Sequence, residues 1–164
     1  MKQAAGIALL AFSSLSPVKG QGTVQDFTLN DTENEPVSYS DLKGDKLTVI
    51  DFWATWCQPC VSSIPKLVEI RTDYKDKGVA FIGVSVDSPR NISKVKPFSR
   101  SLGIDYPVLL DSNSEVMGDL NVTAVPTLMI VDSDDKILYM HEGYHAGDER
   151  IIREEIEKYL SNPQ

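Results

Sequence analysis

The stretch TVIDFWATWCQPC, residues 48–60, contains both cysteines of the chain and decides how the surrounding sequence folds. Its first half belongs to an apolar run, 47–53, whose β-branched and aromatic residues predict a central strand covered on both faces. From Cys57 onward the apolar residues recur at helical spacing, so the strand is expected to pass directly into a helix. One acid, Asp51, interrupts the apolar run just upstream. The helical face comprises Val61, Ile64, Leu67 and Val68.

The patterns on either side of this stretch predict a mixed sheet. Residues 26–44 alternate apolar and polar side chains around a polar turn, which indicates a short N-terminal β-hairpin. A second buried strand, 79–86, follows the first through a helix, so the two strands should be parallel. Residues 127–132 and 136–142 alternate around a turn and predict an antiparallel hairpin. The fold class is therefore α/β, with helices on both faces of a mixed sheet.

Proline and glycine residues mark where the first two helices bend or end. Pro65 is expected to kink the helix that starts near the cysteines, and Gly78 marks its end. A second helical stretch runs to about Leu102, is interrupted or begun by Pro97, and stops at Gly103.

Capping residues predict the two remaining helices. After a short strand at 106–111, Ser112 or Ser114 is expected to cap a brief helix that ends near Leu120. Asp148 is expected to cap the last helix, in which apolar residues again share one face.

The composition describes an acidic chain of one domain. Its 164 residues are 41% hydrophobic, which suits a single compact unit with a sizeable core. The formal net charge is −8, and no basic block carries interleaved aromatic residues, which argues against nucleic acid as a partner. No dimerisation segment is evident, so a monomer is expected.

The first twenty residues have the pattern of a secretory signal peptide. Lys2 precedes an apolar run of 12 residues at 4–15, which Pro17 ends, and Val18 and Gly20 suit a cleavage site. The run is shorter than the roughly 20 apolar residues of a spanning helix. We therefore expect residues 1–20 to be a signal peptide and 21–164 to be an extracytoplasmic domain, periplasmic or secreted, where disulfides persist.

Three interpretations of the cysteine pair differ in what they require. A disulfide between Cys57 and Cys60 closes a very small loop and therefore removes little unfolded-state entropy. A zinc site needs two further ligands, and the chain has no other cysteine, while His141 and His145 lie far along the sequence. Redox chemistry fits the position best, because the amide groups and dipole of a helix N-terminus stabilise a thiolate at Cys57. Pro59 is tolerated there, since its missing N–H would have no partner in the first turn.

Several motifs in this order resemble the thioredoxin superfamily. They are VIDFWATWCQPC, the helix proline Pro65 and AVPTLMIVD at 124–132. The N-terminal hairpin region and an insertion at 84–111 resemble the exported TlpA/ResA-like branch, with an N-terminal region like that of AhpC/TSA redoxins. The resemblance covers about 26–160. It implies a thioredoxin fold with the hairpin and a central insertion added to the mixed sheet.

The resemblance also implies roles for individual residues. Cys57 would be the exposed attacking thiol and Cys60 the recessed resolving thiol. Asp51 would be the buried acid that moves a proton to or from Cys60. Pro126 would be a cis-proline facing the disulfide, and the Val125 backbone would pair with a client strand.

Four further residues would support the site. Trp53 and Trp56 would pack it and supply its apolar rim, and packing is favoured over a catalytic role for both. Gln58 and Pro59 would tune the relative stability of thiolate and disulfide.

The residues by themselves leave alternatives open for two of these roles. Burial of Asp51 in a doubly covered strand should raise its pKa towards that of a useful general base, but a hydrogen-bonded core acid is the alternative. Pro126 by itself fits an ordinary proline at a strand entry, because only about 5–6% of X–Pro bonds are cis.

The sequence differs at two places from the thioredoxin-superfamily proteins that it resembles. TlpA/ResA-like proteins often have Asn where this chain has Asp51, and ordinary thioredoxins pair the acid with a Lys on the next strand, where this chain has Gly83. Asp51 is therefore expected to lack a compensating charge and to have a higher pKa. The acid that some cytochrome-maturation members carry near Asp87 and Ser88 has no clear counterpart, which leaves a role in cytochrome c maturation open.

The sequence HEGYH, residues 141–145, matches the H-E-x-x-H motif of zinc proteases, but the sequence around it does not predict the helix that this motif needs. That chemistry needs both histidines on one face of a helix with Glu142 as the base. Here the motif begins at a strand end and contains Gly143, so we expect a turn and no metal site.

The expected function is that of a thiol–disulfide oxidoreductase, most simply one that reduces disulfides of exported clients with electrons from a membrane or extracytoplasmic thiol donor. The pair Cys57–Cys60 itself would be the redox group, without a bound cofactor. The alternatives are an oxidant or isomerase, a peroxiredoxin-like peroxidase, and a binding module with a vestigial cysteine pair. The peroxidase is disfavoured because Thr55 stands only two residues before Cys57 and the accompanying proline of that family's motif is missing.

Overall fold

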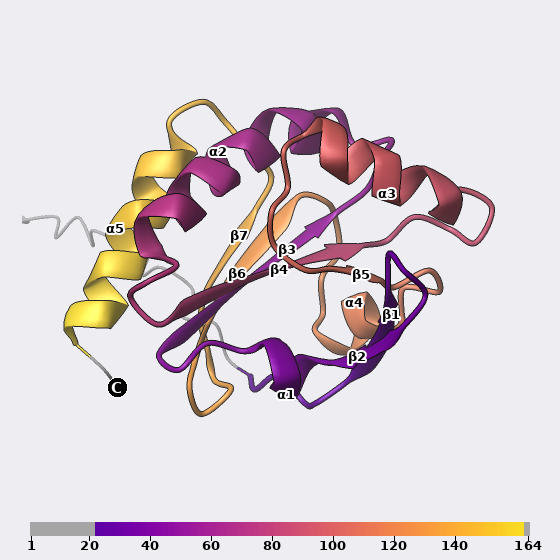
Figure 1. The fold of residues 1–164 in the computed structure, drawn as a ribbon. Helices are drawn as coiled ribbons and strands as arrows, with labels where there is room; N and C mark the ends of the chain where they lie inside the picture. The colour runs from indigo at the N-terminus through magenta and orange to yellow at the C-terminus, as the bar shows by residue number, and fades with distance from the viewer. Residues whose placement is uncertain (1–21, 163–164) are drawn as a thin grey trace, which may run out of the picture.

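One seven-stranded mixed sheet organises the molecule. The computed structural model describes residues 22–162, so the expected signal peptide lies outside the described residues. The strand order is β2-β1-β5-β4-β3-β6-β7. Helices α2, α3 and α5 cover one face of the sheet, and α1 and α4 lie on the other (Figure 1). The α/β prediction with helices on both faces is confirmed.

The predicted central strand lies in the middle of this sheet. β3 (Leu47–Trp53) is buried at every position. It pairs in parallel with β4 (Val79–Ser85) and antiparallel with β6 (Thr127–Asp132). β6 continues into an antiparallel hairpin with β7 (Ile137–Glu142), as predicted.

The N-terminal hairpin extends the other edge of the sheet. β1 (Thr28–Asp31) pairs antiparallel with β2 (Pro36–Ser38) and with β5 (Val108–Leu110). β5 lies parallel to β4. A four-residue helix, α1 (Tyr39–Leu42), follows β2 and was not predicted, because its pattern is too short to show a helical period.

Two of the three long helices begin or end differently from expectation. α2 (Gln58–Tyr74) stops before Gly78, which instead adopts φ +81° in the turn into β4. α3 (Ile92–Ser101) runs through Pro97 rather than being interrupted or begun by it. A proline removes one backbone hydrogen bond, and buried Val95 on the same helix supplies packing that offsets this loss.

The two expected caps are also corrected. Ser114 stands at the N-cap position of α4 (Glu115–Asp119), but within residues 22–162 its side chain makes no capping bond. The Asp111 carboxylate accepts the first backbone N–H groups of α4 instead. α5 (Asp148–Ser161) has Gly147 at its N-cap, and Asp148 accepts hydrogen bonds from the His145 N–H and from His141.

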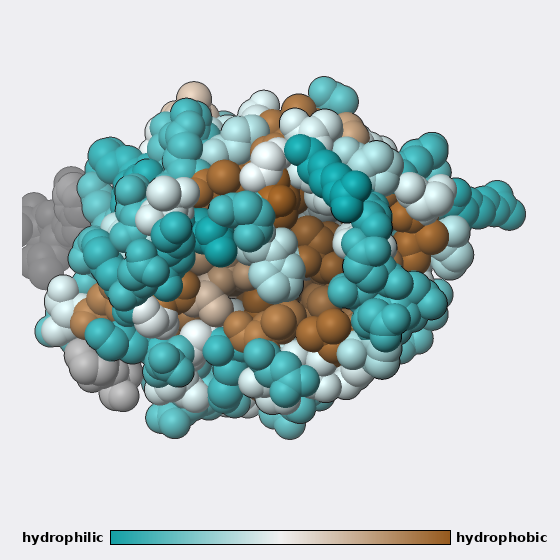
Figure 2. All heavy atoms as spheres, viewed as in Figure 1, coloured by the Kyte–Doolittle hydropathy of each residue, from teal (hydrophilic) through white to brown (hydrophobic). Residues whose placement is uncertain are grey.

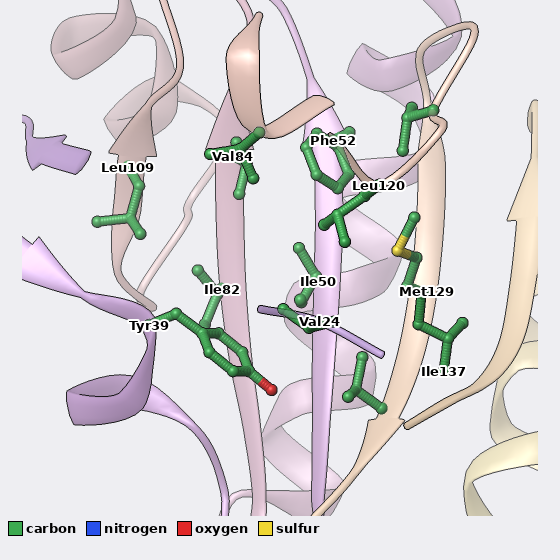
Figure 3. Close-up of a cluster of buried hydrophobic side chains, with 13 residues drawn as sticks. Val24, Tyr39, Ile50, Phe52, Ile82, Val84, Leu109, Leu120, Met129 and Ile137 are labelled. Atoms are coloured by element: carbon green, nitrogen blue, oxygen red, sulfur yellow. The ribbon is translucent and has the colours of Figure 1, made fainter. Parts of the chain in front are cut away.

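Alternation along the strands divides the core into two apolar layers. Even-numbered residues of β3, such as Ile50 and Phe52, pack under α1 and α4 (Figure 3). Odd-numbered residues, such as Val49, pack under α2 and α5. Because side chains alternate along a strand, Asp51 and Trp53 face the α2 side of the sheet.

The face of the molecule drawn in Figure 2 combines polar and apolar regions. Figure 2 shows polar side chains over most of the visible face and apolar side chains at its centre. A cavity of ≈ 340 Å³ between α3 and the β1–β2 hairpin is lined in part by Val37, Ile104 and Pro107. Within the described range, no helix combines the length and apolar character that crossing a membrane requires.

Candidate active site

The cysteine pair lies at the junction of β3 and α2. Cys57 and Cys60 form a disulfide, with their Cα atoms 5.3 Å apart. Cys57 is the N-cap residue of α2, and its Sγ accepts the Cys60 backbone N–H at 3.2 Å. A helix N-terminus favours negative charge, so this position suits a thiolate on Cys57 after reduction.

Cys57 is less exposed to solvent than expected, whereas Cys60 is buried as expected. Cys57 is only 4% exposed and Cys60 1%, so the expected exposed thiol is covered in the disulfide form. The cause is an apolar cluster around the disulfide that includes Trp53, Val95 and partly buried Val125. Gln58 and Pro59, between the cysteines, are exposed.

The two tryptophans have opposite environments. Trp56 is 61% exposed and is the one large hydrophobic side chain classed as exposed among residues 22–162. Trp53 is fully buried and stacks on Phe98 of α3, with ring centroids 6.3 Å apart. Trp56 is therefore available to a partner molecule, whereas Trp53 packs the interior of the site.

Asp51 lies in the buried strand below the cysteines. Its register partners are Gly83 of β4 and Leu128 of β6, so the position opposite Asp51 carries no charge. Burial raises the pKa of Asp51 to about 7. Among the described residues, its Oδ2 has no hydrogen-bond partner. A carboxyl that titrates near neutral pH is suited to take and return protons.

Asp51 and Pro126 border the same small cavity. The Val125–Pro126 bond is cis, which is the isomer that the resemblance implied. The Pro126 carbonyl accepts the Gly143 N–H at 2.8 Å, which ties this segment to the end of β7. Pro126 and Asp51 both line a cavity of ≈ 20 Å³, together with Ser63 of α2. The fold thus brings position 126 to the acid, 75 residues away in the sequence.

The comparisons with known proteins agree with this arrangement. Residues 21–140 match the AhpC/TSA family. The chain belongs to this family. It is 32% identical over 135 residues to "Thiol-disulfide oxidoreductase ResA" of Bacillus thuringiensis, covering 82% of this chain and 73% of that protein.

Solved structures show the same architecture. A protein of Chlorobium tepidum, assigned as the thiol:disulfide interchange protein DsbE, superposes with a TM-score of 0.78 at 28% identity, covering 88% of this chain and 99% of that one. A thioredoxin-like protein of Porphyromonas gingivalis superposes with a TM-score of 0.71 at 32% identity, covering 91% and 97%. This AhpC/TSA-family chain is therefore a ResA-like thiol–disulfide oxidoreductase with a thioredoxin fold.

One buried acid of this AhpC/TSA-family chain was not assigned a role from the sequence. Asp87 follows β4, and its carboxylate accepts the Thr55 N–H at 2.8 Å, the Thr55 hydroxyl at 2.6 Å and the Ser85 hydroxyl at 3.0 Å. Asp87 therefore anchors the loop that carries Trp56 and leads into Cys57. The sequence feature that could have indicated this role is an acidic residue directly after a predicted buried strand.

The HEGYH motif is not arranged as in zinc proteases. His141 and Glu142 end β7, and Gly143 has φ +83°, so the motif lies on a strand and a turn rather than on a helix. His141 contacts Asp148, while Glu142 accepts a hydrogen bond from Thr123. The predicted turn is confirmed from Gly143 onward, where the chain leaves β7, whereas His141 and Glu142 still lie on the strand.

Proposed function

We propose that this oxidoreductase reduces disulfides of extracytoplasmic client proteins, using Cys57 and Cys60 as its redox group and no bound cofactor. The observation that carries the proposal is the position of the pair at the N-terminus of α2, with Asp51 buried in the strand behind it. ResA and DsbE relatives, named for thiol–disulfide chemistry, support the same reaction class.

The first step is attack by Cys57. The Cys57 thiolate, stabilised by the helix N-terminus, bonds to one sulfur of the client disulfide, and the other client sulfur leaves as a thiolate. The product is a mixed disulfide between Cys57 and the client. Exposed Trp56 and the backbone of Val125 would contact the client chain beside the reacting sulfur.

The second step releases the client. Asp51, in its ionised form, accepts the proton of the Cys60 thiol, and the resulting thiolate attacks Cys57 Sγ. The bond between Cys57 and the client breaks, and the client leaves with its second thiolate, which takes up a proton. Two electrons have passed from the Cys57–Cys60 dithiol to the client disulfide. A membrane or extracytoplasmic thiol donor must then reduce the pair again.

The proposed clients are exported proteins that contain pairs of cysteines. The resemblance implies pairs of cysteines in exported proteins, among them those of apocytochromes c. In this proposal the protein acts as a monomer outside the cytoplasm, after residues 1–20 are removed. Because the chain is acidic, nucleic acid is not an expected partner.

Trapping of the mixed disulfide tests the mechanism. Cys60→Ser should accumulate a covalent complex with a disulfide-containing client peptide, because the resolving thiol is gone. Cys57→Ser, the matched control, should form no such complex. Non-reducing electrophoresis and mass spectrometry of the complex provide the measurement. Undiminished disulfide reduction by both variants would refute the mechanism, and rapid consumption of hydrogen peroxide by the dithiol form would favour the peroxidase instead.

A further inference from the structure

The HEGYH segment, residues 141–145, lies against the acid of the proposed reaction. His141, Gly143 and Tyr144 line the same cavity of ≈ 20 Å³ as Asp51. Asp51 is only 3% exposed, whereas Tyr144, in the loop between β7 and α5, is half-buried and reaches the surface. Asp51 therefore belongs to the inner wall of this cavity, and Tyr144 belongs to its outer wall.

The other polar side chains around the cavity already have partners. Lys66 of α2 pairs with Glu69 at 3.0 Å, His141 contacts Asp148 at 2.9 Å, and the Ser63 hydroxyl donates to the Cys60 carbonyl at 3.2 Å. Asp51 Oδ2, by contrast, has no hydrogen-bond partner among residues 22–162. A space of this volume has room for about one water molecule. The Asp51 carboxyl is therefore separated from bulk water by the outer wall of the cavity.

Contacts at both ends of the loop hold Tyr144 in this wall. The Tyr144 hydroxyl donates to Glu149 Oε2 at 3.2 Å, and the Gly147 N–H donates to the same oxygen at 3.0 Å. At the other end, the Gly143 N–H donates to the Pro126 carbonyl at 2.8 Å. Gly143 has φ +83°, a conformation that glycine adopts at little cost, where the chain turns away from β7. The loop is thus tied to α5 and to the cis-proline segment, with Tyr144 between the two ties.

Charged and titratable groups face Asp51 from each element around it. Lys66 of α2, His141 of β7 and Glu149 of α5 line the cavity with it, and Tyr106, just before β5, is close enough for the Asp51 charge to raise its pKa. Lys66 and Glu149 carry opposite charges, so their effects on Asp51 oppose each other. Burial is the cause that raises the pKa of Asp51 to about 7. What covers Asp51 therefore matters more to its ionisation than the charges around the cavity.

We propose that Tyr144 is a positioning residue for the reaction, whose ring closes the outer wall of the cavity and keeps bulk water from the Asp51 carboxyl. A carboxyl that is cut off from water resists ionisation, so the closed wall makes Asp51 a stronger base for the Cys60 proton. This benefit to the reaction rests on the role of Asp51 in the proposed function, whereas the cover itself does not.

An NMR titration of the oxidised protein tests the cover without any client. The Asp51 carboxyl resonance is assigned by its loss in Asp51→Asn. Tyr144→Ala should lower the Asp51 midpoint by about 1 pH unit or more, because water then reaches the carboxyl. Tyr144→Phe is the matched control: it keeps the ring and removes only the hydroxyl bond to Glu149, so its midpoint should stay within about 0.3 pH unit of the wild type.

A graded variant keeps the test independent of how well the alanine variant folds. Tyr144→Leu retains part of the apolar cover, so its Asp51 midpoint should lie between those of Tyr144→Ala and the wild type. A wild-type midpoint in both Tyr144→Ala and Tyr144→Leu would overturn the proposal. So would a midpoint in Tyr144→Phe that falls as far as in Tyr144→Ala, because the hydroxyl bond rather than the ring would then be responsible.

The pH profile of client release separates this inference from the proposed function. In Tyr144→Ala, the midpoint for release of the client from the mixed disulfide should move to lower pH by the same amount as the Asp51 resonance, and Tyr144→Phe should restore the wild-type profile. If the Asp51 resonance shifts in Tyr144→Ala while the release profile does not, the cover is upheld and the assigned role of Asp51 fails.

Discussion

At the scale of single residues, Asp51 combines a position expected for an apolar side chain with an ionisable group. Its neighbours along β3 are fully buried, and its partner on β4 is Gly83. Burial opposes the charged form and raises its pKa to about 7. The same property that suits the carboxyl to proton transfer therefore costs stability once it is ionised.

Asp51→Asn should stabilise the oxidised protein at high pH. The ordinary pKa of 3.8 applies to the unfolded chain and about 7 to the folded one, so the folded state binds more protons between these values. Stability must then fall as pH rises through this window, by at most about 4 kcal/mol, and the whole penalty is present above pH 7. Relative to wild type, Asp51→Asn should raise the free energy of unfolding by about 2–4 kcal/mol at pH 8 and far less at pH 4.5.

Guanidinium unfolding of both proteins at the two pH values gives the measurement. Asp119→Asn, at an exposed position, is the control. Its free energy of unfolding should differ from that of the wild type by the same small amount at both pH values. If Asp51→Asn changes the free energy of unfolding equally at pH 4.5 and pH 8, folding does not raise the pKa of the Asp51 carboxyl, and the prediction is wrong.

At the scale of elements, the loop between β3 and α2 is held from the neighbouring strand. Asp87, just beyond β4, accepts both the backbone N–H and the hydroxyl of Thr55. Both strands end at the same edge because they are parallel, so a short loop after one can reach the loop of the other. The position of Cys57 therefore depends on β4 as well as on its own strand.

Thr55→Val should weaken this anchor while keeping the size of the side chain. It removes a hydrogen bond to a charged group, which contributes about 1.5–3 kcal/mol, and leaves the backbone bond in place. We expect the free energy of unfolding to fall by about that amount, as measured with denaturant. Thr72→Val, at an exposed position of α2, is the matched control and should change it by less than about 0.5 kcal/mol. Equal stability of the two variants would show that the Thr55–Asp87 contact does not stabilise the loop.

At the scale of the whole molecule, the redox state and folding stability are linked. The disulfide is enclosed by an apolar cluster built from β3, α2 and α3. If folding favours the disulfide over the dithiol, the folded protein is a reductant, and its oxidised form must be the more stable one. Every 30 mV by which folding lowers the reduction potential corresponds to about 1.4 kcal/mol of that difference.

The proposed direction predicts a potential near or below about −250 mV, in the range of thioredoxin. Titration against defined thiol buffers, followed by tryptophan fluorescence, measures this value. Denaturant unfolding should then show the oxidised form to be more stable than the reduced form. A potential above about −180 mV, with the reduced form the more stable, would assign the protein as an oxidant or isomerase.

The sequence alone determined the elements whose signal is local. The apolar run into Cys57, the buried strand of β4 and the hairpin of β6 and β7 were predicted because their side-chain period and turn residues lie within each segment. The cysteine pair was located at a helix N-terminus for the same reason, and the register of Asp51 with Gly83 was predicted from the resemblance.

Tertiary structure alone decided the features that join distant segments. Cys57 is covered by side chains from β3, α2 and α3, so no pattern around the cysteine could give its exposure. Asp111 rather than Ser114 caps α4, because its carboxylate lies close to three amide groups of that helix. Tyr106 meets Trp53 over Gly83 only because β4 and β5 are neighbours in the sheet. Local periodicity specifies which face of an element is buried, whereas the contacts across that face depend on strand order and register.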